Sequence, residues 1–540
     1  MEAVRRPPGA AAQDDGCDRV MTSPDNPTQV KELYAIAQQH AIAREFDKAL
    51  AAYLEALQLM PDDPDLLLQV SYMLSLSGQY RNARDYALRA HAKGTTRPEV
   101  MKQLLSRLRT FNEVPAMQAC IERMLPMSRI TIPMLIAIAA QLAYVGLPEK
   151  AIKFLDEARR GDADYPATLL SRAHVLLYLG RFDEAARDLA RVIKRAPHLA
   201  QAYWLQSQLR RQSATENHVA QIVGQCAAQR TAQDMALLCF ALHKELDDLG
   251  RHDEAWQALQ RGCASKRRSL TYQSAQSART FAALQGFRPR NPVHADARAD
   301  PSPIFIVGMH RSGTTLLEQL LDGHPDVRGL GELYDFTSAM REATDHHCAG
   351  VIDATIVERA DGVDFSEVGA RYLAGVAWRL GGERHFIDKL PSNFMNLGFI
   401  CEALPGAKVL HMVRDPMETC FSNLRELFSD ANPYSYDLTE LADFFIGYRR
   451  LMEHWHQRYP GRILDVDYAR LTLDPETEVR RVCDFVGLDF EPAMLQLQAR
   501  TRSVVTASAV QVRSAIKAQE APKWRAYEAY LQPLKQRLAT

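Results

Sequence analysis

The sequence carries no excess of charge of either sign. Lys and Arg together number 65, Asp and Glu number 66, and the formal net charge at pH 7 is −1. Proteins whose main partner is nucleic acid or an anionic membrane usually carry a strong basic field. The balance therefore predicts no nucleic-acid partner, and it places any phosphate site in a local group of residues.

Paired cysteines and long apolar runs are also missing. The nine cysteines are scattered and form no C-x-x-C pair, which is typical of reduced thiols in a cytosol and predicts neither a disulfide framework nor a cysteine-based zinc site. No apolar run reaches the length of about 18 residues that a membrane span requires. Residues 1–27 place prolines and acids where a signal peptide needs an apolar core. We interpret them as a disordered leader and expect a cytoplasmic protein without a membrane span.

A pattern with a period of 34 residues fills the N-terminal half of this 540-residue chain. Ala49 recurs as Ala83 and Gly146 recurs as Gly180, in each case 34 residues later. A further copy, GRHDEAWQAL at 250–259, is shifted by two residues, and the units near 112 and 214 are degenerate. Small Ala at helix crossings, Gly in the turns and Pro near the start of the next unit predict stacked helical hairpins. The pattern resembles the tetratricopeptide repeat, and we assign residues 28–285 to it.

A stack of this kind presents a concave groove that suits a peptide or a protein segment. We therefore expect an acceptor peptide or protein to bind through the repeat domain, while a purely structural role in dimerisation or as a rigid support stays open. The stretch GFRPRNPVHADARADPSP at 286–303 contains four prolines and breaks the helical periodicity. Residues 286–302 are therefore predicted to be an interdomain linker.

From residue 303 to 540, short apolar strand-like runs alternate with helical patterns. The runs are PIFIVG, HFIDK, KVLHMV and RILDVDY. Such runs predict a central parallel sheet covered by helices on both faces. The expected fold is thus an all-α tetratricopeptide-like solenoid followed by an α/β, P-loop-like domain. Ligands of such sheets bind at the carboxyl ends of the strands, where the chemical motifs of this sequence lie.

The first strand-like run leads into the loop GMHRSGTT at 308–315. Its spacing matches G-x-x-x-x-G followed by two residues, which offers backbone N–H groups and a helix N-terminus to an anion, with Arg311 inside the loop. Thr314 stands where nucleotide triphosphatases have lysine. Since no strand-ending Asp is evident as a magnesium ligand either, phosphate transfer from ATP fits poorly.

A second anion site is indicated by VLHMVRDPMETCFS. Arg414 directly follows a buried strand, Pro416 stands at the first position of a helix, and Ser422 lies about two turns along it. An arginine at a strand end with a hydroxyl nearby can hold a phosphate. The alternative is a structural ion pair between Arg414 and Asp415. Two phosphate sites in one fold predict a ligand that is phosphorylated at both ends.

These motifs carry a resemblance to a known family. FIVGMHRSGTTLLEQLLDGHPDV looks like the 5′-phosphosulfate loop of sulfotransferases that use 3′-phosphoadenosine 5′-phosphosulfate (PAPS), and VLHMVRDPMETCFS looks like their 3′-phosphate site. The likeness covers about 303–530 and is closest to tyrosylprotein sulfotransferases and to bacterial proteins that join tetratricopeptide repeats to a sulfotransferase domain. It implies PAPS as co-substrate, PAP as product and no metal, and it accounts for the missing lysine.

The resemblance also implies roles for individual residues. Glu332 matches the general base, Lys389 matches a lysine that stabilises the transferring sulfonyl group, and Ser508 and Ser514 compete for one further serine. The alternatives are a solvated turn carboxylate for Glu332 and a surface charge beside Asp388 for Lys389. The catalytic set is completed by Arg311, and the implied cofactor-binding residues are Arg311, Ser312, Gly313, Thr314, Thr315, Arg414, Ser422, Tyr468 and Lys523.

The chemistry of sulfate transfer suits these residue types. A hydroxyl acceptor loses its proton as it attacks sulfur, and a phenol with a pKa near ~10 needs a positioned carboxylate for this. Negative charge on the sulfonyl oxygens and on the departing phosphate calls for fixed donors such as Arg311 and Lys389. We therefore expect direct in-line displacement without a covalent enzyme intermediate.

Several alternatives stay open at this point. A protein tyrosine is the favoured acceptor, and glycans, lipids and small molecules are the others. A P-loop kinase or nucleotidase, and a repeat scaffold with an inactive transferase-like domain, are the competing classes. An oligomer is not excluded by anything in the sequence. We interpret DHHC at 345–348 as a polar loop, because adjacent histidines rarely converge on one metal ion.

Overall fold

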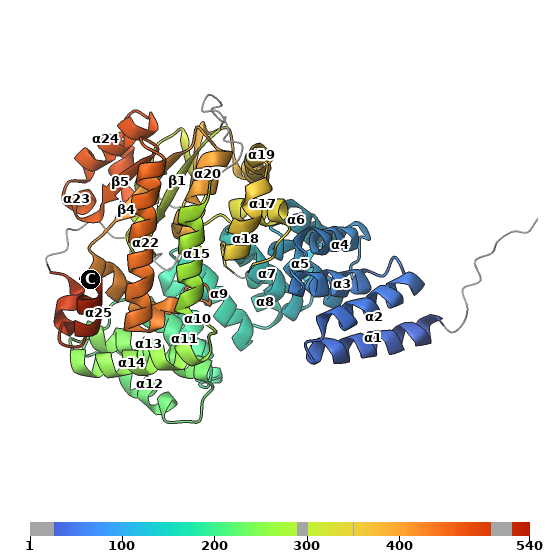
Figure 1. Ribbon diagram of the computed structural model, residues 1–540. Helices are drawn as coiled ribbons and strands as arrows, with labels where there is room; N and C mark the ends of the chain where they lie inside the picture. The colour runs from blue at the N-terminus through green and yellow to red at the C-terminus, as the bar shows by residue number, and fades with distance from the viewer. Residues whose placement is uncertain (1–25, 289–300, 349, 498–520, 540) are drawn as a thin grey trace, which may run out of the picture.

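The computed structural model describes residues 26–288, 301–348, 350–497 and 521–539. Within these ranges a helical solenoid is followed by a domain with a five-stranded parallel sheet (Figure 1). The predicted fold class is thus confirmed. Residues 1–25 of the leader, most of the linker, and both Ser508 and Ser514 lie outside the described residues.

The solenoid keeps its period through the unit near 112, which is degenerate in sequence, whereas the helices after Ala200 begin out of phase, at 219, 232 and 252. The second helices of successive hairpins begin at 46, 80, 114, 148 and 182, and the first helices of the following hairpins begin at 64, 98, 132, 166 and 200. The solenoid helices are α1 (Asn26–Ile42), α2 (Phe46–Leu59), α3 (Pro64–Leu76), α4 (Tyr80–Ala92), α5 (Pro98–Thr110), α6 (Val114–Arg123), α7 (Ile132–Tyr144), α8 (Pro148–Gly161), α9 (Pro166–Tyr178), α10 (Phe182–Arg195), α11 (Ala200–Gln208), α12 (Val219–Cys226), α13 (Ala232–Asp248), α14 (His252–Arg268) and α15 (Ser274–Gly286).

One backbone conformation explains how the degenerate unit near 112 stays in phase. The turn between the two helices is left-handed at Gly78, Gly146 and Gly180, with φ between 72° and 77°. At the same repeat position Arg44 has φ 60° and Asn112 has φ 58°. Asn is one of the few residues that adopt this conformation readily, so the turn survives without glycine.

The sheet has the strand order β2-β3-β1-β4-β5, with every pair parallel. Side chains of β1 alternate between two cores: Phe305 and Val307 pack on one face of the sheet, and Ile304 and Ile306 on the other. The chain passes from β1 to β2 and β3 on one side and then to β4 and β5 on the other. The carboxyl ends of β1 and β4 therefore meet at the point where the strand order reverses. The strands are β1 (Ser302–Gly308), β2 (Val327–Gly329), β3 (His385–Asp388), β4 (Lys408–Val413) and β5 (Ile463–Asp467). Two of them, β3 and β5, end in aspartate, so the expectation that no strand ends in Asp is wrong.

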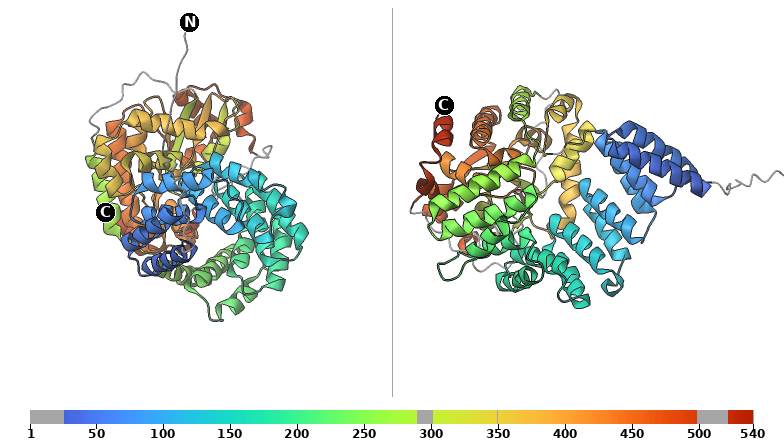
Figure 2. Two further views of the ribbon diagram at one scale, coloured as in Figure 1. Left: turned by 90° about the vertical axis from the view of Figure 1, so that its right-hand side faces the viewer. Right: turned by 90° about the horizontal axis from the view of Figure 1, so that it is seen from below.

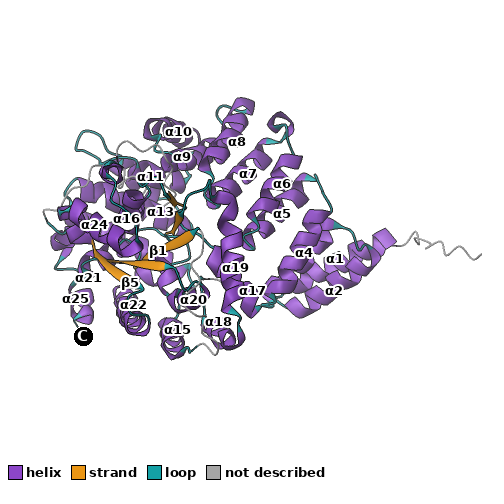
Figure 3. Cartoon of the chain, turned by 90° about the horizontal axis from the view of Figure 1, so that it is seen from above, coloured by secondary structure: helices purple, strands orange, loops and turns teal. Residues whose placement is uncertain are grey.

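Helices cover both faces of the sheet, as the apolar runs predict (Figure 3). No helix among the described residues is both long enough and apolar enough to cross a bilayer. The α-helices are α16 (Thr314–Leu321), α17 (Asp335–Thr344), α18 (Ala354–Arg359), α19 (Phe365–Val376), α20 (Leu397–Ala403), α21 (Pro416–Leu424), α22 (Leu438–Arg458), α23 (Tyr468–Leu473), α24 (Pro475–Val486) and α25 (Gln532–Leu538). The 3₁₀ turns are η1 (Met127–Arg129), η2 (Ala360–Gly362), η3 (Ala377–Arg379), η4 (Pro391–Phe394), η5 (Pro433–Tyr436), η6 (Pro492–Leu495) and η9 (Lys523–Tyr527).

The solenoid curves along the sheet domain and is fastened to it at separate places (Figure 2). Near its start, the Tyr80 hydroxyl of α4 lies 2.9 Å from the Ser338 hydroxyl of α17. Near its end, Arg267 of α14 donates to both carboxylate oxygens of Glu440 on α22, each at 2.8 Å. The last helix, α15, packs along α22. These contacts fix the concave side of the solenoid relative to the carboxyl ends of the strands.

Candidate functional site

The loop after β1 is shaped to approach an anion with its backbone. Gly313, at φ 110°, caps α16, and a Cβ atom built there would lie 2.4 Å from Cδ2 of Tyr468. Only glycine fits a position with both a left-handed φ and so close a neighbour. Thr314 and Thr315 follow as the first residues of α16 and are both buried. The strand, loop and helix N-terminus that the sequence predicts are all present.

The end of β4 lies directly beside this loop. The Nη1 atom of Arg414 donates to the carbonyl oxygen of Arg311 at 3.2 Å, and its Nε donates to Oε2 of Glu418 at 2.9 Å. The guanidinium of Arg414 lies 4.4 Å from the ring centroid of Tyr468, which begins α23 after β5. Asp415 instead caps α21, where its carboxylate accepts from the Glu418 amide. The alternative pairing of Arg414 with Asp415 is therefore wrong.

Arg311 connects the two loops. Its Nε donates to the Ser422 hydroxyl at 3.3 Å, and its Nη1 lies 3.6 Å from Oε2 of Glu426. The sequence grouped Ser422 with Arg414, whereas the structure puts its hydroxyl on Arg311. The side chains of Arg311, Arg414 and Ser422, which follow β1 and β4, therefore lie close together.

Two buried polar atoms of the loop have no hydrogen-bond partner among the described residues, so a bound ligand could supply one. Among the residues that the structure describes, none makes a hydrogen bond with Ser312 Oγ or with His310 Nδ1. Ser312 is 1% exposed, and an unpaired buried hydroxyl is costly unless something else satisfies it. Together with the close approach at Gly313, this observation means that the residues present fit an anionic phosphate group.

Glu332 and Lys389 are brought together by two neighbouring strands. After β2 the chain continues to pair with β3, through bonds from the Leu330 amide to the Ile387 carbonyl and from the Lys389 amide to the Gly331 carbonyl. As a result Lys389 Nζ donates to Oε1 of Glu332 at 2.8 Å. The sequence does not single out β2, because a run of three residues is too short to show a period.

Burial distinguishes the members of this pair. Lys389 is fully buried, so it is not a surface charge, whereas the side chain of Glu332 is 32% exposed. A second carboxyl, Glu318 of α16, lies 3.9 Å from Lys389 Nζ. Burial raises the pKa of Glu318 to about 7, against the opposing effect of Lys389. Burial also lowers the pKa of His310 to about 4, so this imidazole is neutral at pH 7.

Glu318 is not predicted from the sequence. Its only signal is a carboxylate within the otherwise apolar run LLEQLL of α16. Because that helix is buried on the inside of the domain, a charged residue there needs a partner such as Lys389.

A cavity of about 2710 Å³ separates the concave face of the solenoid from the sheet domain. Glu332, His310 and Glu426 line it from one side, and Tyr144 and Tyr178 line it from the solenoid. Burial and the nearby Glu332 raise the pKa of Tyr178 to about 12. Repeat helices thus present side chains to the same space as Glu332.

Aromatic rings form part of the cavity wall. Tyr144 and Tyr334 stack with their centroids 6.2 Å apart, and they are 56% and 36% exposed. Tyr334 comes two residues after Glu332, and the stacked pair lines the same cavity as the Glu332 carboxylate.

Lys523 is positioned by a different set of contacts. Its Nζ lies 3.9 Å from Oδ2 of Asp247 on α13, and its side chain is 62% exposed. It lines the cavity rather than packing on Arg311 or Arg414. The DHHC loop docks on the solenoid, where the ring centroid of His347 lies 5.8 Å from that of Tyr80.

Part of the chain is similar to known proteins. Residues 303–492 match the model of the family described as "Sulfotransferase family". An uncharacterized protein of Aquifex aeolicus (strain VF5) is 29% identical over 406 residues, which cover 71% of this chain and 52% of that protein. Protein-tyrosine sulfotransferase 1 of Danio rerio is 25% identical over 208 residues, covering 36% of this chain and 55% of its own. The sulfotransferase domain from the Synechococcus PCC 7002 olefin synthase is 20% identical and covers 45% of this chain and 98% of its own, with a TM-score of 0.26.

The fold and the site define a two-domain protein in which a tetratricopeptide-like solenoid precedes an α/β domain with a phosphate-type loop. That second domain is a sulfotransferase-family domain over residues 303–492, and the resemblance found in the sequence motifs is confirmed at this level. The chain spans about half the length of the curated relatives it matches.

Proposed function

We propose that this protein is a PAPS-dependent sulfotransferase that moves a sulfonyl group to a hydroxyl acceptor. The observation that carries the proposal is the adjacency of two strand ends suited to anions, those of β1 and β4, beside the Glu332–Lys389 pair. A ligand with phosphates at both ends matches two such sites better than ATP does, because a lysine is missing at Thr314.

The positions of the residues suggest which part of PAPS each of them would contact. The loop backbone, Ser312 and Arg311 would hold the 5′-phosphosulfate, and Arg414 would hold the 3′-phosphate beside Tyr468. When bound, PAPS supplies the sulfonyl group that is transferred. Lys389, held in place by its carboxylate partner at 2.8 Å, provides a fixed positive charge for the sulfonyl oxygens.

Glu332 is the proposed general base. Its carboxylate lines the cavity and is partly exposed, so it can accept the proton of an acceptor hydroxyl that enters from that side. Glu318 is only 4% exposed, which makes it the less accessible of the two carboxylates and the poorer candidate for this role.

The cavity supports a protein acceptor, with a tyrosine as the favoured hydroxyl. Its volume of about 2710 Å³ is larger than the roughly 300–1,000 Å³ of ordinary small-molecule pockets. Exposed tyrosines of the solenoid and the sheet domain line it on both sides, and aromatic rings are efficient anchors for polypeptides.

Binding measurements test the donor. Isothermal titration of the full chain with PAP, and separately with ATP and Mg²⁺, should show PAP binding at least about tenfold tighter, a difference of about 1.4 kcal/mol. Preference for ATP and Mg²⁺ would instead indicate a P-loop kinase or nucleotidase.

Transfer itself is tested with radiolabelled PAPS. Incubation with a cell lysate should label proteins, and mass spectrometry should find the added sulfonyl group on tyrosine. Tight PAP binding without any labelled product would favour the alternative of an inactive repeat scaffold, and label in glycans or lipids would redirect the acceptor assignment.

A further inference from the structure

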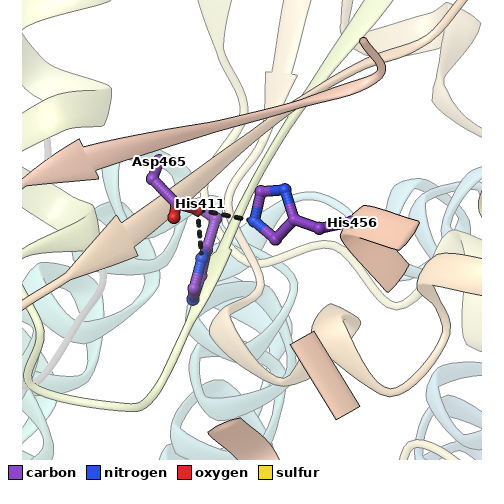
Figure 4. Close-up of side chains that lie close together, drawn as sticks. All are labelled: His411, His456 and Asp465. Atoms are coloured by element: carbon purple, nitrogen blue, oxygen red, sulfur yellow. Dashed lines mark hydrogen bonds and ion pairs between the residues drawn. The ribbon is translucent and has the colours of Figure 1, made fainter. Parts of the chain in front are cut away.

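Three side chains outside the proposed site converge on the β4–β5 edge of the sheet (Figure 4). His411 of β4 and Asp465 of β5 face each other in register. Asp465 Oδ1 lies 2.7 Å from His411 Nδ1 and 2.8 Å from Nε2 of His456 on α22. Within the described ranges, no other group of three His, Cys, Asp or Glu side chains offers ligand atoms this close, within 4.8 Å of one another.

We propose that His411, His456 and Asp465 bind one divalent transition-metal ion, with zinc as the representative ion. Two imidazoles and one carboxylate are a ligand set that zinc accepts, with water in the fourth position. The side chain of Asp465 is 55% exposed and that of His456 is 36% exposed, so both an entry path and room for a water ligand exist. The proposal does not rest on the sulfotransferase assignment.

The two distances from Asp465 need only a small adjustment. Around a tetrahedral ion with bonds of about 2.0–2.1 Å, neighbouring ligand atoms are about 3.3 Å apart. The observed separations of 2.7 Å and 2.8 Å therefore have to grow by about half an ångström. Rotation of the exposed His456 and Asp465 side chains supplies this movement, while His411, which is 8% exposed at its side chain, stays in place.

The second nitrogen of His411 is held as metal-ligating imidazoles usually are. Its Nε2 lies 2.5 Å from the hydroxyl of Tyr448, a buried residue of α22. An outer partner of this kind fixes the ring so that the other nitrogen points at the ion.

The site would act on the anion-binding residues through the backbone. Three residues after His411 comes Arg414, and three residues after Asp465 comes Tyr468, whose ring lies 4.4 Å from the Arg414 guanidinium. An ion that joins β4 to β5 therefore fixes the relative position of these two side chains. The role inferred for the metal is structural support of the second anion site.

The competing explanation is an ion-paired cluster in which both imidazoles donate protons to Asp465. The full chain is first treated with a chelator, and its zinc affinity is then measured. This measurement distinguishes a metal site from an ion-paired cluster. His456→Gln and Asp465→Asn change exposed side chains and should leave the fold intact. His454→Gln, on the same helix, is the matched control.

The wild type and His454→Gln should bind one zinc ion at least about tenfold more tightly than His456→Gln or Asp465→Asn. Zinc should raise the thermal unfolding midpoint of the wild type and of His454→Gln, but not that of the two ligand variants. Cobalt(II) in place of zinc should give visible bands without a thiolate charge-transfer band, since no cysteine takes part. Unchanged zinc affinity in His456→Gln, a thiolate band, or no binding at all would each overturn the proposal and leave an ion-paired cluster.

Discussion

Lys389 Nζ lies 2.8 Å from Oε1 of Glu332, and the lysine is fully buried while the glutamate reaches the cavity. A buried ammonium group without a partner would be strongly destabilising, so Lys389 holds the Glu332 carboxylate in one position. The geometry places a fixed carboxylate at the wall of a large cavity with a fixed cation behind it. The first prediction concerns this pair.

Glu332→Ala should reduce sulfate transfer by about 10²- to 10⁴-fold, the usual contribution of a general base, while the affinity for PAP stays within about twofold. Glu332→Gln keeps an oxygen for Lys389 and should lose activity to a similar extent with less loss of stability. Transfer rates with radiolabelled PAPS and PAP titrations measure both effects.

The control for this experiment is Glu367→Ala, which removes an exposed carboxylate of α19. It should leave both rate and affinity unchanged. Full activity in both Glu332 variants would refute the base assignment.

Gly313→Ala should abolish PAP binding. The added methyl group would lie 2.4 Å from Cδ2 of Tyr468, at a backbone φ of 110°. Gly382→Ala is a matched control, because Gly382 has φ 111° with nothing within 4 Å of its Cβ position. Both variants bear the same backbone strain, so a loss of PAP binding in Gly313→Ala alone isolates the close contact with Tyr468. Equal behaviour would show that this contact does not matter.

Ser312→Ala should weaken PAP binding by roughly tenfold without destabilising the free protein. The Ser312 hydroxyl is buried and, among the described residues, has no hydrogen-bond partner, so its removal should raise stability by up to about 1 kcal/mol. Ser435→Ala serves as control, because that hydroxyl is equally buried and likewise without a partner within the described ranges. Thermal unfolding and PAP titration should show similar stability changes but a binding loss only in Ser312→Ala. Unchanged PAP affinity would remove Ser312 from the anion site.

Glu318 predicts a specific dependence of stability on pH. Its pKa is raised to about 7 in the folded protein, whereas the unfolded chain loses this proton near pH ~4.3. Between pH 6 and pH 8 the folded state alone must release the proton, so this group lowers the free energy of unfolding by about 1.4 kcal/mol over that interval. The contribution of Glu318 to the free energy of unfolding is fully present below the pKa of this group in the unfolded chain, and it is lost as the pH rises through 7.

Glu318→Gln keeps an acceptor for the Gly331 amide, which donates to Glu318 Oε1 at 2.8 Å, but has no proton to release. Urea unfolding at pH 6 and pH 8 should therefore show a smaller fall in stability for Glu318→Gln than for the wild type or Glu367→Gln. An identical fall in all three would contradict the raised pKa.

Much of the architecture is predictable from local pattern. The helical period, the strand-like runs and the helix start at Pro416 coincide with the observed elements, because periodicity and capping act within a few residues. The strand β2 escaped prediction because it is three residues long and exists only through pairing with β3. The motifs of the sequence likewise indicate Arg311 and Ser422 but not the contact between them.

The sequence by itself determined the repeat, the order of strands and helices along the chain, and the residue types of the two loops that we propose to bind phosphate. These depend on spacing and on local backbone preferences. Tertiary structure alone decided that Glu332 meets Lys389, that Ser422 contacts Arg311 rather than Arg414, and that the solenoid encloses a cavity above them. It also brought His411, His456 and Asp465 together from two strands and a helix. Such contacts depend on strand order and helix packing. These join residues that are far apart in the chain, so no fixed sequence spacing predicts them.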